Sequence, residues 1–144
     1  FQKFNPNIAG WQFEIVDDPA GDMQFRYITF AWKKSGGTGI QLQLHGAPDT
    51  WGHRYHAGAN AQNWNPSIEV SPDLDEDWAL YTRDLFDDWG EFILTGVAFS
   101  PSSLDFAIYD HIVLHQDEED PLFLDVDAKG KTAAVWADIK QETR

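Results

Sequence analysis

Hydrophobic and polar residues alternate through residues 25–45, which form the clearest β pattern in the chain. The first half of this stretch is rich in aromatic and β-branched residues, which favour strands. In the second half Ile40, Leu42 and Leu44 alternate with polar residues. Residues 35–39 lie between the halves and contain three glycines, which allow the positive φ angles of a tight reversal. The pattern predicts a β-hairpin over residues 25–45.

Shorter runs of the same kind predict the remaining strands. Residues 1–10 are expected to be irregular, residues 46–66 to form a long Gly- and Asn-containing loop, and residues 84–90 to form an acidic loop. Seven or eight strands with turns at short intervals, and no helix among them, indicate an all-β, antiparallel β-sandwich. The expected strands outside the hairpin are residues 11–15, 67–70, 78–85, 92–99 and 106–114.

The chain changes character after His115. Residues 1–115 are interpreted as the β-sandwich module, and residues 116–130 begin with an acidic run and form a linker. Ala133, Trp136 and Ile139 have helical spacing, which predicts a short C-terminal helix within residues 131–144, or else the start of a following domain.

Composition narrows the possible functions. The 144 residues fit one domain, and 10 basic against 24 acidic residues give a net charge of −14, which disfavours nucleic acid and anionic membrane surfaces as partners. There is no cysteine, and no apolar run is long enough for membrane insertion. No initiator Met or signal-like start is present, so we expect a module cut from a longer protein.

Five sequence blocks carry a resemblance to known domains. FAIYDHIVL at 106–114 resembles the closing strand of galactose-binding-like jelly rolls, the fold of many carbohydrate-binding modules. The other blocks resemble a domain that recurs in large exported, cytochrome-associated proteins of planctomycete-type bacteria. The resemblance covers about residues 10–115 and implies a jelly-roll fold and an exported, periplasmic or cell-surface location. These other blocks are FRYITFAWKKSGGTGIQLQLHG, RYHAG at 54–58, WALYTRDLFDDWGEF at 78–92 and LTGVAFSP at 94–101.

A polar row on the predicted sheet is the first candidate ligand site. Side chains alternate between the two faces of a strand, so the residues between Ile40, Leu42 and Leu44 should share the face opposite the core. Amide, imidazole and guanidinium groups beside aromatic rings suit the hydroxyls and the apolar face of a sugar. A solvated outer sheet face would give the same alternation. The candidates are Gln41, Gln43 and His45, with Tyr81, Arg83, Tyr109 and His111 from later strands.

The predicted loop at 46–66 supplies the second set of ligand candidates. Trp51 and Trp64 are expected to stack against a sugar, with support from Arg54 and Tyr55. The alternative is that the loop folds back on itself and uses the two tryptophans as a small core of its own.

Calcium is the metal that the sequence favours, because Ca²⁺ prefers clustered carboxylate and carbonyl oxygens. Glu14, Asp17 and Asp18 lie on or just after the first strand, and Asp110 lies in the last, which runs near the first in galactose-binding-like folds. The alternative role is turn capping. His111 follows Asp110, whereas many carbohydrate-binding jelly rolls have a second acidic residue there.

No motif for catalysis is present, since the chain has no GxSxG, no cysteine nucleophile and no glycine-rich loop ahead of a helix. The sequence therefore predicts a non-catalytic binding module rather than an enzyme, most consistent with binding of a polysaccharide or oligosaccharide. The alternative is a structural or interaction domain that orients adjacent domains of the parent chain without binding a small ligand.

Overall fold

The computed structural model describes residues 2–47 and 50–122, which form ten strands and the short helix α1. The predicted helix within residues 131–144, and the linker beyond residue 122, lie outside the described residues. The strands are β1 (Lys3–Asn5), β2 (Phe13–Ile15), β3 (Gln24–Phe25), β4 (Tyr27–Ser35), β5 (Gly39–Ala47), β6 (Thr50–Gly58), β7 (Ile68–Ser71), β8 (Ala79–Asp84), β9 (Phe92–Phe99) and β10 (Phe106–His115).

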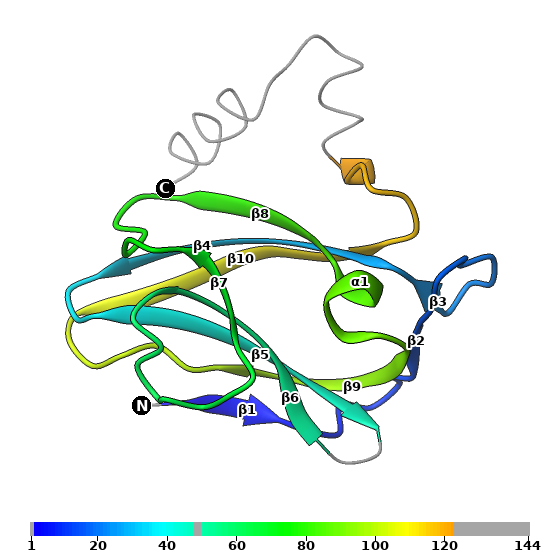
Figure 1. The fold of residues 1–144 in the computed structure, drawn as a ribbon, viewed down its shortest axis with the longest axis horizontal. Coiled ribbons are helices and arrows are strands. Elements are labelled where there is room, and N and C mark those ends of the chain that lie inside the picture. Colours follow the sequence, from blue (N-terminus) through cyan, green and yellow to red (C-terminus); the bar gives the residue numbers. More distant parts are fainter. Residues whose placement is uncertain (1, 48–49, 123–144) are drawn as a thin grey trace, which may run out of the picture.

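The strands form two sheets that face each other, so the predicted all-β, sandwich-like class is confirmed (Figure 1). The seven-stranded sheet has the order β3-β2-β9-β5-β6-β7, with β1 also paired to β9. The three-stranded sheet has the order β10-β4-β8. Most neighbours are antiparallel, and β2–β3 and β6–β7 are parallel.

The two halves of residues 25–45 do not pair with each other, so the prediction of a hairpin there is wrong. β4 pairs with β10 and β8, whereas β5 pairs with β6 and β9 in the opposite sheet. The glycine-rich turn therefore carries the chain across the sandwich. Alternation specifies that each strand has one apolar face, and two such faces can meet across a core as readily as they lie side by side in one sheet.

The hairpin of this region is formed one strand later, by β5 and β6. Much of the predicted 46–66 loop is therefore strand, because Thr50–Gly58 pairs with β5 over nearly its whole length. Two glycines and two histidines among these residues hide the alternation that places Tyr55 and Ala57 in the core. The other predicted strands are confirmed to within two residues at each end.

The predicted acidic loop at 84–90 contains the helix α1 (Leu85–Trp89). Asp84 caps its N-terminus by accepting a hydrogen bond from the Asp87 amide at 3.0 Å, and Gly90 ends it at a positive φ of 77°. Burial alone would raise the pKa of Asp84, but hydrogen bonds from Arg26 and from the Asp87 amide lower it. This cap and ion pair fix α1 at one end of the sandwich.

The core lies between the sheets and is dominated by aromatic rings. Phe30 and Trp32 on β4 face Tyr55 on β6, with Phe30 and Tyr55 ring centroids 5.7 Å apart. The Tyr55 hydroxyl donates to Asp88 at 2.7 Å, which satisfies its only polar atom inside the core. The buried cluster comprises Ile15, Ile28, Phe30, Trp32, Ile40, Leu42, Leu44, Tyr55, Ala57, Leu85, Phe92 and Leu94.

Lys34, near the end of β4, is 1% exposed and ties two turns together. Its ammonium donates to the carbonyl oxygens of Ser35, Gly36 and Leu104 at 3.0, 2.8 and 2.6 Å. The β4–β5 turn is thereby held against the β9–β10 loop by a buried cation whose donors are satisfied.

We expect Lys34→Met to destabilise the fold by about 1–3 kcal/mol, because methionine fills the space but leaves buried carbonyls without their donor. Chemical denaturation measures this as a fall in the midpoint. The matched control is Lys33→Met: this side chain is half-buried and contacts the ring of Trp78 at 5.5 Å, so a loss under about 1 kcal/mol is expected. Equal losses in the two variants would contradict the role assigned to Lys34.

Candidate functional site

The predicted polar row lies on the outer face of the seven-stranded sheet. Gln41, Gln43 and His45 alternate along β5 with residues of the core cluster. The register places His56 beside Gln41 and Arg54 beside Gln43, so two β6 side chains join the same face. A face with an amide row, a guanidinium and imidazoles is therefore present as the alternation predicts.

The side chains of this row are buried and bonded to each other or to neighbouring strands. Gln43 is 1% exposed, donates to Ser100 Oγ at 2.7 Å and accepts from Arg54 Nε at 2.7 Å. His45 Nδ1 lies 2.8 Å from Thr95 Oγ1. The row therefore acts first as a support that fixes Arg54, since its hydrogen-bonding capacity is already in use.

Gln41 differs from the rest of the row. Its amide nitrogen donates to Asn60 Oδ1 and Ser67 Oγ, both at 3.3 Å, while its side-chain oxygen is buried without a partner among the described residues. His56 Nδ1 lies 2.7 Å from the same Ser67 hydroxyl. These contacts attach the segment after β6 to the sheet face.

Two aromatic rings lie beside the row, one against His45 and one against Arg54. Trp51 packs edge-on against His45, with centroids 4.8 Å apart, and meets Phe4, which is 63% exposed. The ring of Trp64 lies 5.7 Å from the Arg54 guanidinium and is 37% exposed. Trp51 lies on β6 rather than in the predicted loop. The register between β5 and β6 is irregular after Leu44, next to Trp51. We call these pairs the Phe4–Trp51 and Arg54–Trp64 platforms.

The later candidates belong to the opposite sheet and do not join this face. Tyr81 and Arg83 lie on β8, and Tyr109 and His111 lie on β10. These two strands flank β4, across the core from the polar row. Each of the four side chains has a partner other than the side chains of that row. Tyr81 donates to Asp75, Arg83 pairs with Asp88, Tyr109 donates to the backbone carbonyl of Gln41, and His111 contacts Asp120.

Tyr55 also points away from the outer face. It is fully buried in the core, where its hydroxyl donates to Asp88, and desolvation together with that carboxylate raises its pKa strongly. Arg83 contacts the same carboxylate at 3.0 Å through Nε. To predict the face on which Tyr55 and Arg83 lie, one must know which sheet each strand joins, and alternation alone does not provide that information.

The predicted calcium ligands are spread over separate elements. Asp17 binds Arg26 at 2.5 Å, Glu14 lies on β2, and Asp110 lies on β10, which pairs with β4 rather than with the first strands. Within residues 2–47 and 50–122, no three His, Asp or Glu side chains converge as metal ligands would. Calcium binding through Glu14, Asp17, Asp18 and Asp110 stays a prediction.

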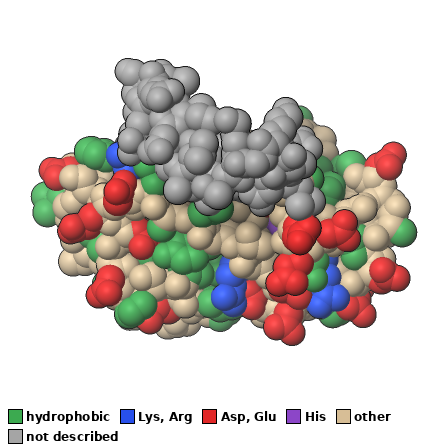
Figure 2. All heavy atoms as spheres, turned by 90° about the horizontal axis from the view of Figure 1, so that it is seen from above, with side chains coloured by type: hydrophobic (Ala, Val, Ile, Leu, Met, Phe, Trp, Pro, Cys, Tyr) green, Lys and Arg blue, Asp and Glu red, His purple; other side chains and the backbone are tan. Residues whose placement is uncertain are grey.

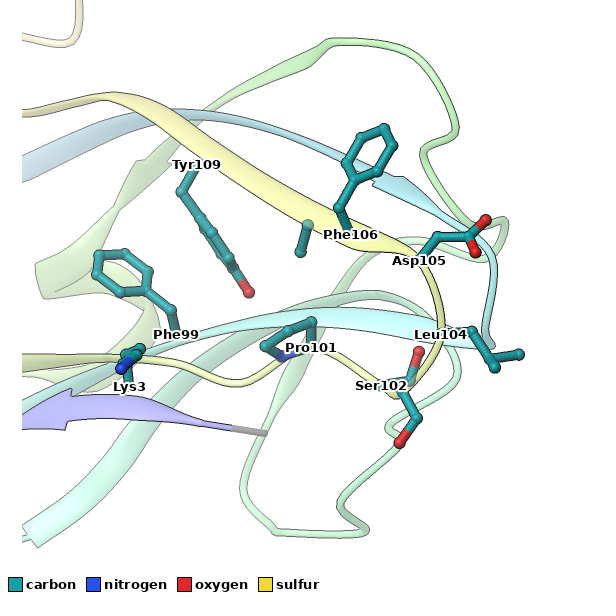
Figure 3. Close-up of a pocket in the computed structure, with 10 residues that line it drawn as sticks. Lys3, Phe99, Pro101, Ser102, Leu104, Asp105, Phe106 and Tyr109 are labelled. Atoms are coloured by element: carbon teal, nitrogen blue, oxygen red, sulfur yellow. The ribbon is translucent and has the colours of Figure 1, made fainter.

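Sequence reasoning missed a groove between the two sheets (Figure 3). Its volume is about 640 Å³, which falls in the range of small-ligand sites. The ring of Tyr109 on β10 and the ring of Phe99 on β9 pack together from opposite walls, with centroids 4.7 Å apart. Phe106, Pro101 and Leu104 extend the apolar lining. The aromatic positions near the β9–β10 turn were the available signal in the sequence.

Comparisons with known proteins found no match for this chain among family models, curated proteins or solved structures. Among the described helices, none has the length and apolar character needed to cross a bilayer. Figure 2 shows Asp and Glu side chains spread across the face in view, as expected from the net charge of −14.

Arg54→Lys should destabilise the protein by about 1–3 kcal/mol although it keeps the positive charge. A single ammonium cannot replace both the Nε bond to Gln43 and the Nη1 bond to the Pro66 carbonyl, at 2.7 and 3.2 Å. Denaturation of both proteins in the same buffer measures the loss. An unchanged midpoint would mean that Arg54 does not hold the outer face together.

His53 predicts a pH dependence of stability. It is 8% exposed and stacks on Phe92 with centroids 4.0 Å apart, and desolvation lowers its pKa despite the Leu44 carbonyl bonded to Nδ1. The unfolded chain therefore binds a proton more readily than the folded one once the pH drops below about 6.5.

The stability contributed by neutral His53 is present above pH 6.5 and is lost as the pH falls toward the lowered folded pKa. Denaturation at pH 7.5 and 5.5 should show a smaller loss in His53→Gln than in the unmodified chain. His56, whose pKa is also lowered by desolvation, preserves part of the dependence in both proteins. Identical pH profiles would contradict the assignment.

Proposed function

We propose that this domain is a non-catalytic carbohydrate-binding module with a galactose-binding-like jelly-roll fold, acting within a larger exported protein. The binding surface is the outer face of the seven-stranded sheet between the Phe4–Trp51 and Arg54–Trp64 platforms. The ligand class is a neutral polysaccharide or oligosaccharide, because a chain of net charge −14 repels acidic glycans.

The observation that carries the proposal is the pair of partly exposed tryptophan platforms on one sheet face. Trp51 and Arg54 are three residues apart in β6, and because the irregular register sets three steps of β6 against two of β5, they lie about 7 Å apart along the strand. That spacing lets two rings of one glycan chain contact the two platforms together. Aromatic faces stack on the C–H side of a pyranose. The hydroxyls of the sugar are then left to form hydrogen bonds with polar neighbours.

The buried polar row supports this surface from beneath. Gln43 holds the Arg54 guanidinium, and Arg54 in turn lies against Trp64, so the second platform is fixed before any ligand arrives. His45 supports Trp51 in the same way. A preformed surface reduces the ordering cost of binding, which favours recognition of weakly interacting ligands such as sugars.

A structural or interaction domain is the second candidate function. The observation that favours it is the groove of Figure 3, which is mainly apolar and lies beside the edge strand β10. Apolar lining next to exposed main-chain groups is typical of surfaces that bind protein segments.

Trp64→Ala and Trp51→Ala should each weaken glycan binding at least about tenfold, because removal of an aromatic anchor costs about 2 kcal/mol and 1.4 kcal/mol is a factor of ten. Affinity electrophoresis in gels that contain neutral plant and algal polysaccharides measures this as a loss of retardation.

Trp78→Ala is the matched control, since Trp78 precedes β8 in the opposite sheet and contacts Lys33. Its retardation should equal that of the unmodified chain. Absence of retardation on the whole polysaccharide panel, or equal losses in all three variants, would refute the proposed surface.

A further inference from the structure

Two hollows follow one another along β10. The first is the groove of Figure 3, of about 640 Å³, which is lined by residues 106, 107 and 109 of this strand. The second, of about 240 Å³, is lined by Ile112 and Leu114 of the same strand and by Phe13 and Val97 of the seven-stranded sheet. We call the two hollows together the β10 trough.

The trough occupies the place where the three-stranded sheet lacks a further strand. β10 pairs with β4 on one side, and no described strand pairs with it on the other. The opposite sheet continues beyond β9 with β1 and β2, and these strands contribute Lys3 and Phe13 to the two hollows. Apolar side chains of the larger sheet therefore have no strand of the described residues facing them at this side of the sandwich.

We propose that the β10 trough binds an extended peptide segment, which adds as a strand to the free edge of β10. The unpaired main-chain groups of an edge strand call for an extended partner, and alternate side chains of that partner would enter the hollows. Ala107 and Leu114 are seven residue steps apart, or about 24 Å of strand, so a segment of about seven or eight residues spans the trough.

The bulge in β10 divides this interaction into two parts. The β10–β4 register shifts between Asp110 and Val113, and His111 has a positive φ of 51°. Main-chain pairing of the peptide is therefore expected with residues 106–109. Beyond the bulge the peptide contributes mainly an apolar side chain to the second hollow.

The chemistry of the trough favours a peptide over a sugar or a second copy of this chain. The polar groups at its rim are already used, since Ser102 Oγ accepts from the amides of Thr38 and Gly39, and Asp105 accepts from Ser35. A second copy of this chain would bring a net charge of −14 against an equal net charge, and this repulsion opposes a dimer. The same charge selects a neutral or basic peptide with apolar residues at alternating positions.

A library of random seven-residue peptides displayed on phage, selected on the full chain, tests the proposal. Selected sequences should have apolar residues at alternating positions and few proline, aspartate or glutamate residues. Synthetic versions should bind in a fluorescence-anisotropy titration. Phe106→Glu should weaken binding at least tenfold, because it places a charge in a side chain that lines the groove and is 50% exposed.

Leu80→Glu is the control, since Leu80 is 38% exposed on β8, at the other edge of the same sheet. Its peptide affinity should remain unchanged. Leu104→Glu, at a groove position that is 71% exposed, repeats the test if Phe106→Glu does not fold. Hydrogen exchange should slow at residues 106–109 and remain unchanged in β8 when peptide is bound.

Selection of proline-rich or acidic peptides, or binding that survives both groove variants, would overturn the proposal. So would protection of residues 106–109 by an oligosaccharide in place of a peptide, or by a dimer that forms with increasing concentration. The carbohydrate proposal is tested separately: Trp64→Ala should leave peptide binding intact, and Phe106→Glu should leave glycan retardation intact.

Discussion

The crossing of the chain from one sheet to the other between β4 and β5 is the constraint on which the rest of the structure depends. The turn is packed so closely that side chains are excluded at two positions. A Cβ at Gly37, where φ is 78°, would collide with Ser103, and a Cβ at Gly39 would collide with the Ala59 carbonyl. Because of this crossing, the apolar faces of β4 and β5 meet each other across the core, and every later strand joins one of the two sheets to which they belong.

The sequence was sufficient to predict most strands and the all-β class, because those depend on local alternation and turn residues. It was insufficient for the pairing of strands. Ile40, Leu42 and Leu44 define an apolar face equally well for a hairpin and for a crossing between sheets. The strand at Thr50–Gly58 was missed for a related reason: His53 occupies an inward position through a stacking contact with Phe92, and sequence gives no sign that this histidine is buried.

The same distinction separates the site residues that were predicted well from those that were not. Gln41, Gln43 and His45 share one face as their spacing requires, and that follows from strand geometry alone. Their burial does not follow from spacing, because it depends on Arg54, Ser100 and Asn60 from three different segments. The assignment of Tyr81 and Tyr109 to that face was wrong. The sheet that β8 and β10 join depends on long-range strand pairing, which local alternation does not show.

Burial of the polar row also separates two kinds of surface on this domain. Apart from the side-chain oxygen of Gln41, the amide row is satisfied internally, which lowers the cost of burying it and holds the overlying Arg54 in place. At the side of the sandwich, β10 has an edge with which no described strand pairs, beside a trough with apolar walls. Fixed rings suit a ligand that brings its own hydroxyls and flat faces, whereas an unpaired strand edge suits a partner that brings a backbone. The platforms lie on the outer face of the seven-stranded sheet, whereas the trough lies where that sheet faces β10.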